Sequence, residues 1–216
     1  MVDDMESEER PGHSRPYRQS ARAEAAEATA RRVIEAFSDS MRSRWFDELT
    51  LEEIAGRAGV TARTVIRRFG GKEGLLAAFA EDFIPAVGVS RDAAPGDVEA
   101  AVARVVAVYE DWGDSVIRNL AQEQRHPALK PLLDRGRLAH RAITAQAFAP
   151  WLEPLGEPDR RRTLDALVAA TDVYAWKLAR RDMGRSREET AILLRRLVDA
   201  VLAQASALAS AAGSRR

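Results

Sequence analysis

The sequence predicts an all-α protein, because several features of its 216 residues favour helices throughout. Apolar residues recur at helical spacing in most segments, and two capping boxes mark helix starts. No stretch alternates between apolar and polar residues as a half-buried strand does. Hydrophobic residues make up 46% and charged residues 31%, which is typical of a globular chain rather than a disordered one. We expect an N-terminal domain of short helices followed by a larger helical domain.

Composition excludes several classes of site. The chain has no Cys, which excludes disulfides, a thiol nucleophile and Cys-based metal centres. With only three His, we expect no metal site and no cofactor. No apolar run approaches the ~18 residues that a membrane span needs, and the start, MVDDMESEER, is acidic. We therefore expect a soluble, cytoplasmic protein without a membrane partner.

The charge balance is neutral, with 33 basic and 33 acidic residues. Most of the basic residues are Arg, and Ala is also frequent, a bias that we attribute to the codons of a GC-rich genome. The number of Arg residues is therefore no argument for nucleic-acid binding. Their placement along the chain can be one.

The N-terminal part is expected to contain four helices. Residues 1–14 are polar and acidic, so we expect a flexible tail there. An apolar stripe beginning near Gln19 predicts the first helix. The segment at 50–53, Thr-Leu-Glu-Glu, matches a capping box with Thr50 as N-cap, and the short helix that it begins ends at Gly59.

A third helix is expected from Thr61 to the glycine pair at 70–71, and a fourth from there to about residue 84. Residues 85–96 contain two Pro and two Gly, the most loop-like composition in the chain. We place a domain boundary in this stretch, which predicts an N-terminal domain over 15–84.

The second domain is expected over residues 97–212 and is helical to its end. Asp97 caps its first, long helix, and a capping box at 186–189 begins its last. Pro residues break the pattern between these two. The expected helices span residues 97–124, 128–135, 136–152, 158–183 and 187–210.

Residues 50–72, TLEEIAGRAGVTARTVIRRFGGK, carry most of the functional information. Two short helices about three residues apart, with a Gly at the bend, are typical of a helix-turn-helix. Gly59 permits the positive φ of the bend, the small Ala55 lets the helices cross closely, and Val60 fills the gap between them.

The second helix of this motif separates apolar from polar residues. At ~100° per residue, its apolar side chains share one face. The opposite face carries Arg63, Thr64, Arg67 and Arg68. Residues 54–72 contain five basic residues and no acid, in a chain of zero net charge. A solvated helix face in an Arg-rich chain is the competing interpretation.

That face suits a DNA duplex. Arg can donate two hydrogen bonds to a guanine edge in the major groove, and Thr can contact bases or phosphates. Lys72 would neutralise a phosphate near a helix N-terminus. Thr50 and Thr61 would place their hydroxyl groups near the DNA backbone.

Residues 19–84, above all LEEIAGRAGVTARTVIRRFGGKEGLLAAF, resemble the DNA-binding domain of the tetracycline-repressor (TetR) family of bacterial transcriptional regulators. The specific match is a helix-turn-helix followed by Phe, two turn residues and Lys-Glu-x-Leu-Leu, here residues 69–76. The segment DVYAWKLARRD and the capped helix after it also look like this family's C-terminal half. Ile66 departs from the family pattern, which commonly has a phosphate-binding Tyr there. Either a contact is missing, or Arg67 and Arg68 replace it.

The resemblance implies a homodimer whose recognition helices enter successive major grooves of a roughly palindromic operator. It also implies a small-molecule effector that binds the C-terminal domain and most often relieves repression. Carried over by position, the implied base or backbone contacts are Arg63, Thr64 and Arg67, and the implied phosphate contacts are Thr50, Thr61 and Lys72. The N-terminal arm, with Arg15, Arg18 and Arg22, either follows the adjacent DNA or is a disordered basic tail.

The last two helices are candidates for the dimer interface, although their apolar stripes could equally be ordinary core. Those stripes are Leu194, Leu197, Val201 and Leu208, and Leu164, Leu167, Thr171, Tyr174 and Leu178. An effector pocket is expected between the helices at 97–124, 136–152 and 158–183. Its candidate residues are Tyr109, Trp112, Asn119, His140, Phe148 and Trp176.

Two other classes of function stay open. One is an all-α enzyme and the other is a helical protein-interaction module whose basic helix binds an acidic partner. The chain contains none of the His-Glu-x-x-His, Gly-x-Ser-x-Gly or Gly-x-Gly-x-x-Gly motifs, and its Gly-Gly-Lys is not a P-loop. We therefore expect no catalytic residues and a DNA-binding regulator rather than an enzyme.

Overall fold

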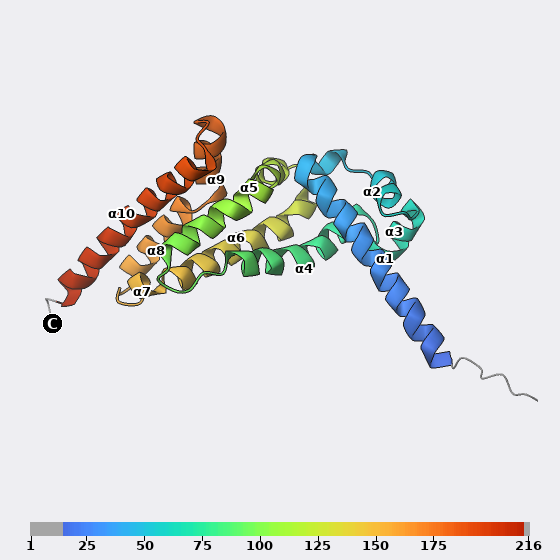
Figure 1. Ribbon diagram of the computed structural model, residues 1–216, viewed down its shortest axis with the longest axis horizontal. Coiled ribbons are helices and arrows are strands. Elements are labelled where there is room, and N and C mark those ends of the chain that lie inside the picture. The colour runs from blue at the N-terminus through green and yellow to red at the C-terminus, as the bar shows by residue number, and fades with distance from the viewer. Residues whose placement is uncertain (1–14, 214–216) are drawn as a thin grey trace, which may run out of the picture.

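The computed structural model describes residues 15–213, so the expected acidic tail at 1–14 lies outside the described residues. This part of the chain is helical and contains no strand, which confirms the all-α prediction. The short helices of the N-terminal part lie at one end of an elongated molecule, and the last helix lies at the other (Figure 1). None of the described helices is both long enough and apolar enough to span a lipid bilayer.

Four helices and one 3₁₀ turn build the N-terminal end. They are α1 (Arg15–Ser43), η1 (Phe46–Glu48), α2 (Leu51–Arg57), α3 (Ala62–Phe69) and α4 (Lys72–Arg91). Both predicted caps are present: the hydroxyl of Thr50 accepts the N–H of Glu53, and that of Thr61 accepts the N–H of Thr64. The Glu53 carboxylate returns the contact to the N–H of Thr50, which completes the capping box.

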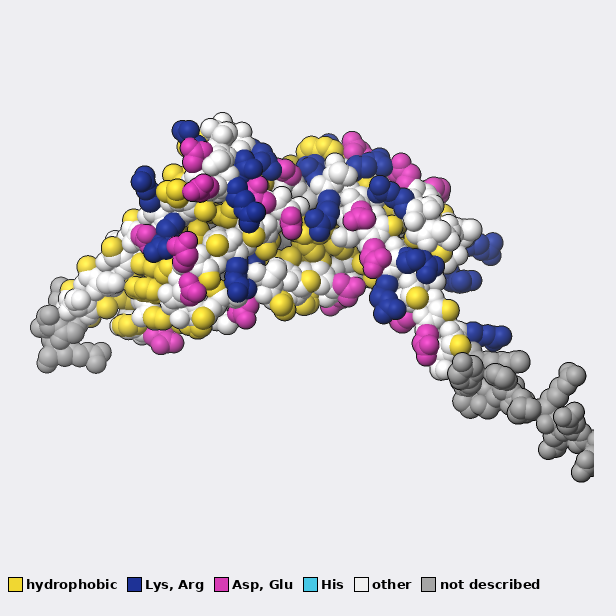
Figure 2. Space-filling view, viewed as in Figure 1, with side chains coloured by type: hydrophobic (Ala, Val, Ile, Leu, Met, Phe, Trp, Pro, Cys, Tyr) yellow, Lys and Arg dark blue, Asp and Glu magenta, His cyan; other side chains and the backbone are white. Residues whose placement is uncertain are grey.

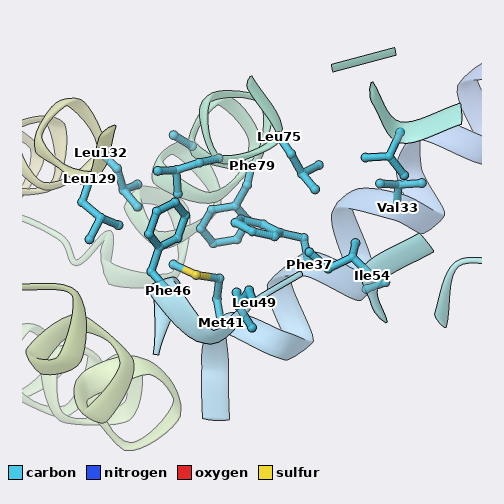
Figure 3. Close-up of a cluster of buried hydrophobic side chains, with 14 of the residues drawn as sticks. Val33, Phe37, Met41, Phe46, Leu49, Ile54, Leu75, Phe79, Leu129 and Leu132 are labelled. Carbon is cyan, nitrogen blue, oxygen red and sulfur yellow. The ribbon is translucent and has the colours of Figure 1, made fainter. Parts of the chain in front are cut away.

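Aromatic and branched side chains from all four helices close the core of this end (Figure 3). Phe37 of α1 meets Phe79 of α4 edge to face, with 5.7 Å between the ring centroids. Ile54 of α2 and Val65 of α3 are buried in the same cluster. The two short helices are therefore held in place by the long ones, because neither is long enough to be stable alone.

Helix α4 is longer than predicted. Pro85 lies inside it, and the helix continues to Arg91, so the predicted loop at 85–96 is wrong over its first half. A Pro inside a helix costs about 3 kcal/mol because it lacks a donor and crowds the preceding turn. Buried and half-buried apolar residues on the N-terminal side of Pro85 offset this cost. The domain boundary itself stays a prediction.

The remaining helices differ from the predicted ones at three places, one of which is Phe148, where the helix predicted at 136–152 is interrupted. They are α5 (Val98–Gln122), η2 (Pro127–Leu129), α6 (Lys130–Ala147), α7 (Ala149–Leu152), α8 (Asp159–Ala170), α9 (Val173–Lys177), the π-helical turn η3 (Leu178–Asp182) and α10 (Arg187–Gly213). Helix α6 is continuous, because Pro131 lies in its first turn, where no N–H is needed. The predicted helix at 158–183 is interrupted, because Asp172 caps α9 by accepting the N–H of Tyr174 at 2.9 Å.

Trp176 is the centre of the second core and is fully buried. Its ring lies against Gly113 of α5, where a Cβ would collide with it. Of the two stripes considered for a dimer interface, Leu167 and Leu194 belong to this core. Leu197, by contrast, is 44% exposed on α10. The core interpretation of the stripes is therefore correct for some of their residues, and the dimer interface stays a prediction.

Candidate nucleic-acid interface and ligand cavity

The predicted helix-turn-helix is formed by α2 and α3. The turn is closed by the N–H of Val60, which donates to the carbonyl of Ala55 at 2.9 Å. Gly59 has a φ of 68°, and Gly70, at the end of α3, has a φ of 80°. Such angles strain any residue with a Cβ, so both glycines are where the backbone requires them.

Helix α3 points its basic side chains away from the molecule. Val65 is fully buried beneath the helix, while Arg63 and Arg67 are exposed. Within the described part of the chain, neither of these two has an ion-pair partner. In Figure 2, Lys and Arg side chains project from the end of the molecule that α1, α2 and α3 form. This arrangement leaves two guanidinium groups free to bind an external anion.

Arg68 differs from the prediction of an unpaired face. Its guanidinium donates to both carboxylate oxygens of Glu27 on α1, each at 2.8 Å. Glu27 is 41 positions away in the sequence, so the local pattern could not reveal the pair. Both side chains are exposed, and such surface pairs contribute about 0–1 kcal/mol, so DNA could compete for Arg68.

Lys72 also differs from the expectation of a free ammonium group. Its Nζ donates to the carbonyls of Phe46 at 2.9 Å and Leu49 at 3.0 Å, and lies 4.6 Å from the centroid of the Phe46 ring. Burial lowers the pKa of Lys72, an effect that Asp47 opposes. Lys72 thus ties the start of α4 to η1, and a phosphate contact from its remaining N–H stays a prediction.

The three predicted Thr contacts have partners within the chain. The Thr50 hydroxyl lies 3.0 Å from a carboxylate oxygen of Glu53, and the hydroxyls of Thr61 and Thr64 lie 3.1 Å apart. A phosphate can only accept, so the Thr50 hydroxyl would have to release Glu53 to bind one, whereas one of Thr61 and Thr64 keeps an O–H free to donate. Ile66, predicted on the apolar face, is 50% exposed at the edge of α3. Among the arm residues, Arg22 is exposed, whereas the side chains of Arg15 and Arg18 lie outside the described residues.

A cavity of about 630 Å³ is lined by residues of both cores, among them Phe79 of the first and Tyr109 of the second. Helices α4, α5, α6, α8 and α9 wall it, mostly with apolar side chains. Four predicted pocket residues line it: Tyr109, Trp112, Asn119 and His140. Phe148 and Trp176 do not, because both are packed in the second core, where the Trp176 N–H donates to Glu110 at 2.9 Å. The prediction that Phe148 and Trp176 line the pocket is therefore wrong.

Sequence reasoning missed the contribution of α4, because it ended this helix too early. Phe83, Val87 and Arg91 lie four residues apart on α4 and all line the cavity. This spacing continues past Pro85 and was the signal that could have found them. Arg91 is 5% exposed, and its Nη2 lies 2.7 Å from Nδ1 of His140.

The surroundings of His140 in the cavity wall determine its protonation state. Burial, assisted by the charge of Arg91, lowers its pKa to about 4, so the ring is neutral near pH 7. Its Nε2 lies 3.1 Å from the carbonyl of Val168 and must carry the proton there. Nδ1 therefore accepts from Arg91. Burial also raises the pKa of Tyr109 to about 12, and its hydroxyl donates to the carbonyl of Thr171 at 3.3 Å.

Comparison with known proteins agrees with this geometry. Residues 40–79, which include α2 and α3, match the model of the bacterial regulatory proteins of the tetR family. A comparison with curated proteins gives no match.

Two solved structures resemble most of the chain. One, described as a candidate transcriptional regulator from Pseudomonas aeruginosa PAO1, has a TM-score of 0.62 at 17% identity and covers 81% of this chain and 90% of its own. The other, described as a candidate TetR-family regulator from Mesorhizobium loti MAFF303099, has a TM-score of 0.60 at 20% identity and covers 82% and 96%. The chain therefore carries a segment similar to the tetR family of bacterial regulatory proteins at residues 40–79, and over most of its length it has an all-α fold like that of these two structures.

Proposed function

We propose that this protein is a sequence-specific, DNA-binding transcriptional repressor that acts as a homodimer and leaves its operator when a small molecule binds. The observation that carries the proposal is the outward face of α3. There Arg63 and Arg67 are exposed and, among the described residues, free of carboxylate partners. The helix that carries them lies within the segment that matches the tetR family.

The dimensions of α3 fit a major groove. An α-helix with its side chains is about 10–12 Å across, and the major groove of B-DNA is about 12 Å wide. Arg63 and Arg67 lie one helical turn apart, so both can reach base edges or phosphates from one docking position. Arg68 and the Thr hydroxyls lie on the flanks of this face and would contact the DNA backbone.

A dimer is needed because one short helix reads few base pairs. Two-fold symmetry would place the α3 helices in half-sites about 34 Å apart. Apolar side chains that are exposed on one chain, Leu197 on α10 and Tyr174 on α9, support an interface at the end of the molecule opposite α3. Charges introduced by Leu197→Glu and Val201→Glu should give monomers in light scattering. A wild-type monomer that binds its operator tightly would contradict this part.

The experiment that tests DNA recognition is footprinting on the DNA upstream of the protein's own gene. We expect protection of a roughly palindromic site, and its loss or relaxation in Arg63→Ala and Arg67→Ala. Arg104→Ala, which removes an exposed Arg from α5, is the matched control for net charge. Competition with scrambled duplex separates operator binding from general attraction to polyanions. Unchanged protection in both α3 variants would show that another element reads the DNA.

We propose release by a small molecule because residues of both cores line the cavity. One of these cores supports α3, and the other surrounds Trp176. Phe79 belongs to the core that supports α3 and also lines the cavity. A ligand that displaces α4 would therefore also displace the helix-turn-helix packed on it. This link is what we expect to convert effector binding into loss of DNA affinity.

A further inference from the structure

The wall of the cavity contains a buried positive charge, the guanidinium group of Arg91. Arg91 is 5% exposed, and its charged group touches a neutral ring, since Nη2 meets Nδ1 of His140. Its carbon Cζ lies 5.7 Å from the centroid of the Tyr109 ring, which is also uncharged. Its Nε is buried and has no hydrogen-bond partner. Among the described residues no carboxylate is in ion-pair contact with Arg91, and Asp172 acts only at longer range on the two rings that Arg91 touches. A buried charge without a contacting counter-charge is costly, so an anionic partner from outside the chain would explain why Arg91 is there.

The other charged residues that line the cavity are already engaged or lie nearer to solvent. Arg141 pairs with Asp165 at 2.6 Å, and Arg137 pairs with Glu123 at 2.5 Å. Asp172 accepts the N–H of Tyr174 as the cap of α9. Among the described residues that line the cavity, Arg91 is thus the charged one that is buried and lacks an anionic partner.

The other residues that line the cavity determine which shape of ligand it can accommodate. Phe83 and Val87 of α4 face the cavity together with the apolar side chains of α5. Along α5 these lining residues extend from Tyr109, beside Arg91, to Leu120, which corresponds to roughly 16 Å of helix. The cavity therefore offers one cationic end and an elongated, mostly apolar wall, in which Ser115 and Asn119 are the polar lining residues of α5.

We propose that this cavity binds an organic acid in which a single carboxylate is attached to an elongated apolar body. The carboxylate accepts hydrogen bonds from the Nε and Nη groups of Arg91, whose planar fork matches a carboxylate. The body lies against Phe83, Trp112 and the apolar residues near them. A single negative charge balances the one buried guanidinium, whereas a phosphate dianion would leave an excess charge among neutral groups. As the effector, this acid rests on the proposed function, but its binding can be measured without DNA.

The test compares ligands that differ only in their head group. Isothermal titration calorimetry of the full chain near pH 7 would use decanoate and decanol, with octanoate and dodecanoate to cover chain length. We expect one carboxylate to bind per chain and the alcohol to bind about 10- to 100-fold more weakly, as for loss of a charged hydrogen bond. In Arg91→Gln this preference should disappear. Arg104→Gln, which removes an exposed guanidinium of α5 that does not line the cavity, is the matched control and should keep it.

Circular dichroism shows whether Arg91→Gln is folded, and the comparison of acid with alcohol on the wild-type chain stands without it. Equal affinity for acid and alcohol, no binding of any of these acids, or full carboxylate affinity in a folded Arg91→Gln would each overturn the inference. The outcome for the proposed function is separate. Carboxylate binding that depends on Arg91 but leaves operator affinity unchanged would support this inference and contradict effector release. Operator binding without carboxylate binding would contradict this inference and leave the proposed DNA-binding function supported.

Discussion

The α3 surface and the cavity both hold arginines that have no carboxylate partner within the described chain, but in opposite environments. Arg63 and Arg67 are solvated, so leaving them unpaired costs the free protein little. Arg91 is buried, so leaving it unpaired is costly and makes a small anion a favourable occupant. The comparison shows that burial, rather than residue type, separates a surface suited to a polyanion from a site suited to one small acid.

The largest loss of stability is expected from a substitution of Phe79, which lies in the N-terminal core and also lines the cavity. Phe79 packs edge to face on Phe37 in the N-terminal core and stacks on Phe83 of the cavity wall with centroids 4.9 Å apart. Phe79→Ala should lower the free energy of unfolding by about 3–5 kcal/mol, because it leaves a void in both regions. Urea denaturation measures this change. Leu138→Ala, at an exposed position on α6, is the control and should have little effect.

A smaller change in the free energy of unfolding is expected with pH, because His140 in the cavity wall titrates. The pKa of His140 falls from 6.5 to about 4 on folding, so the unfolded chain binds more protons between these values. The stabilisation is complete above pH 6.5 and is lost as the pH falls toward 4, by roughly 3 kcal/mol in all. His140→Gln should remove this dependence, because its amide can accept from Arg91 and donate to the Val168 carbonyl without titrating.

Unfolding midpoints at several pH values between 4 and 7 check this expectation. Leu138→Ala changes an exposed side chain that does not titrate and should retain the wild-type profile. If the profile of His140→Gln matched that of the wild type, the ring would not be held neutral by its surroundings.

The next effect concerns Lys72 and separates a structural role from a DNA contact. Lys72→Met should lower stability by about 1–3 kcal/mol, because the carbonyls of Phe46 and Leu49 lose a charged donor. The slope of log affinity against log salt for operator DNA should also fall by about one, since we predict that the remaining N–H of Lys72 binds a phosphate. An unchanged slope would limit Lys72 to its structural role and contradict the phosphate contact.

The sequence predicted what depends on neighbours in the chain. The caps at Thr50 and Thr61, the bend at Gly59 and the buried Val65 each follow from residues a few positions apart, and the structure confirms them. Contacts across longer separations were not accessible in this way. Arg68 meets Glu27 only because the tertiary fold brings the two side chains together from α3 and α1, and nothing near Arg68 in the sequence indicates it.

The cavity was predicted in part for a similar reason. Tyr109, Trp112, Asn119 and His140 lie on helices whose periodicity is clear, and all four line it. Arg91 was missed because Pro85 was interpreted as the end of α4, although tertiary packing keeps the helix intact. Phe148 and Trp176 were placed in the cavity because aromatic side chains of core and pocket look alike in a sequence.

The central claim is that α3 recognises DNA through its unpaired arginines. Fluorescence anisotropy on the footprinted operator tests it most directly, with Arg67→Ala, Arg68→Ala and Arg104→Ala compared at equal salt. We predict that Arg67→Ala weakens binding by about 1–3 kcal/mol and that Arg68→Ala, whose guanidinium already pairs with Glu27, weakens it less. Arg104→Ala should bind as the wild type does. Equal affinities for all three variants and the wild type would contradict the claim.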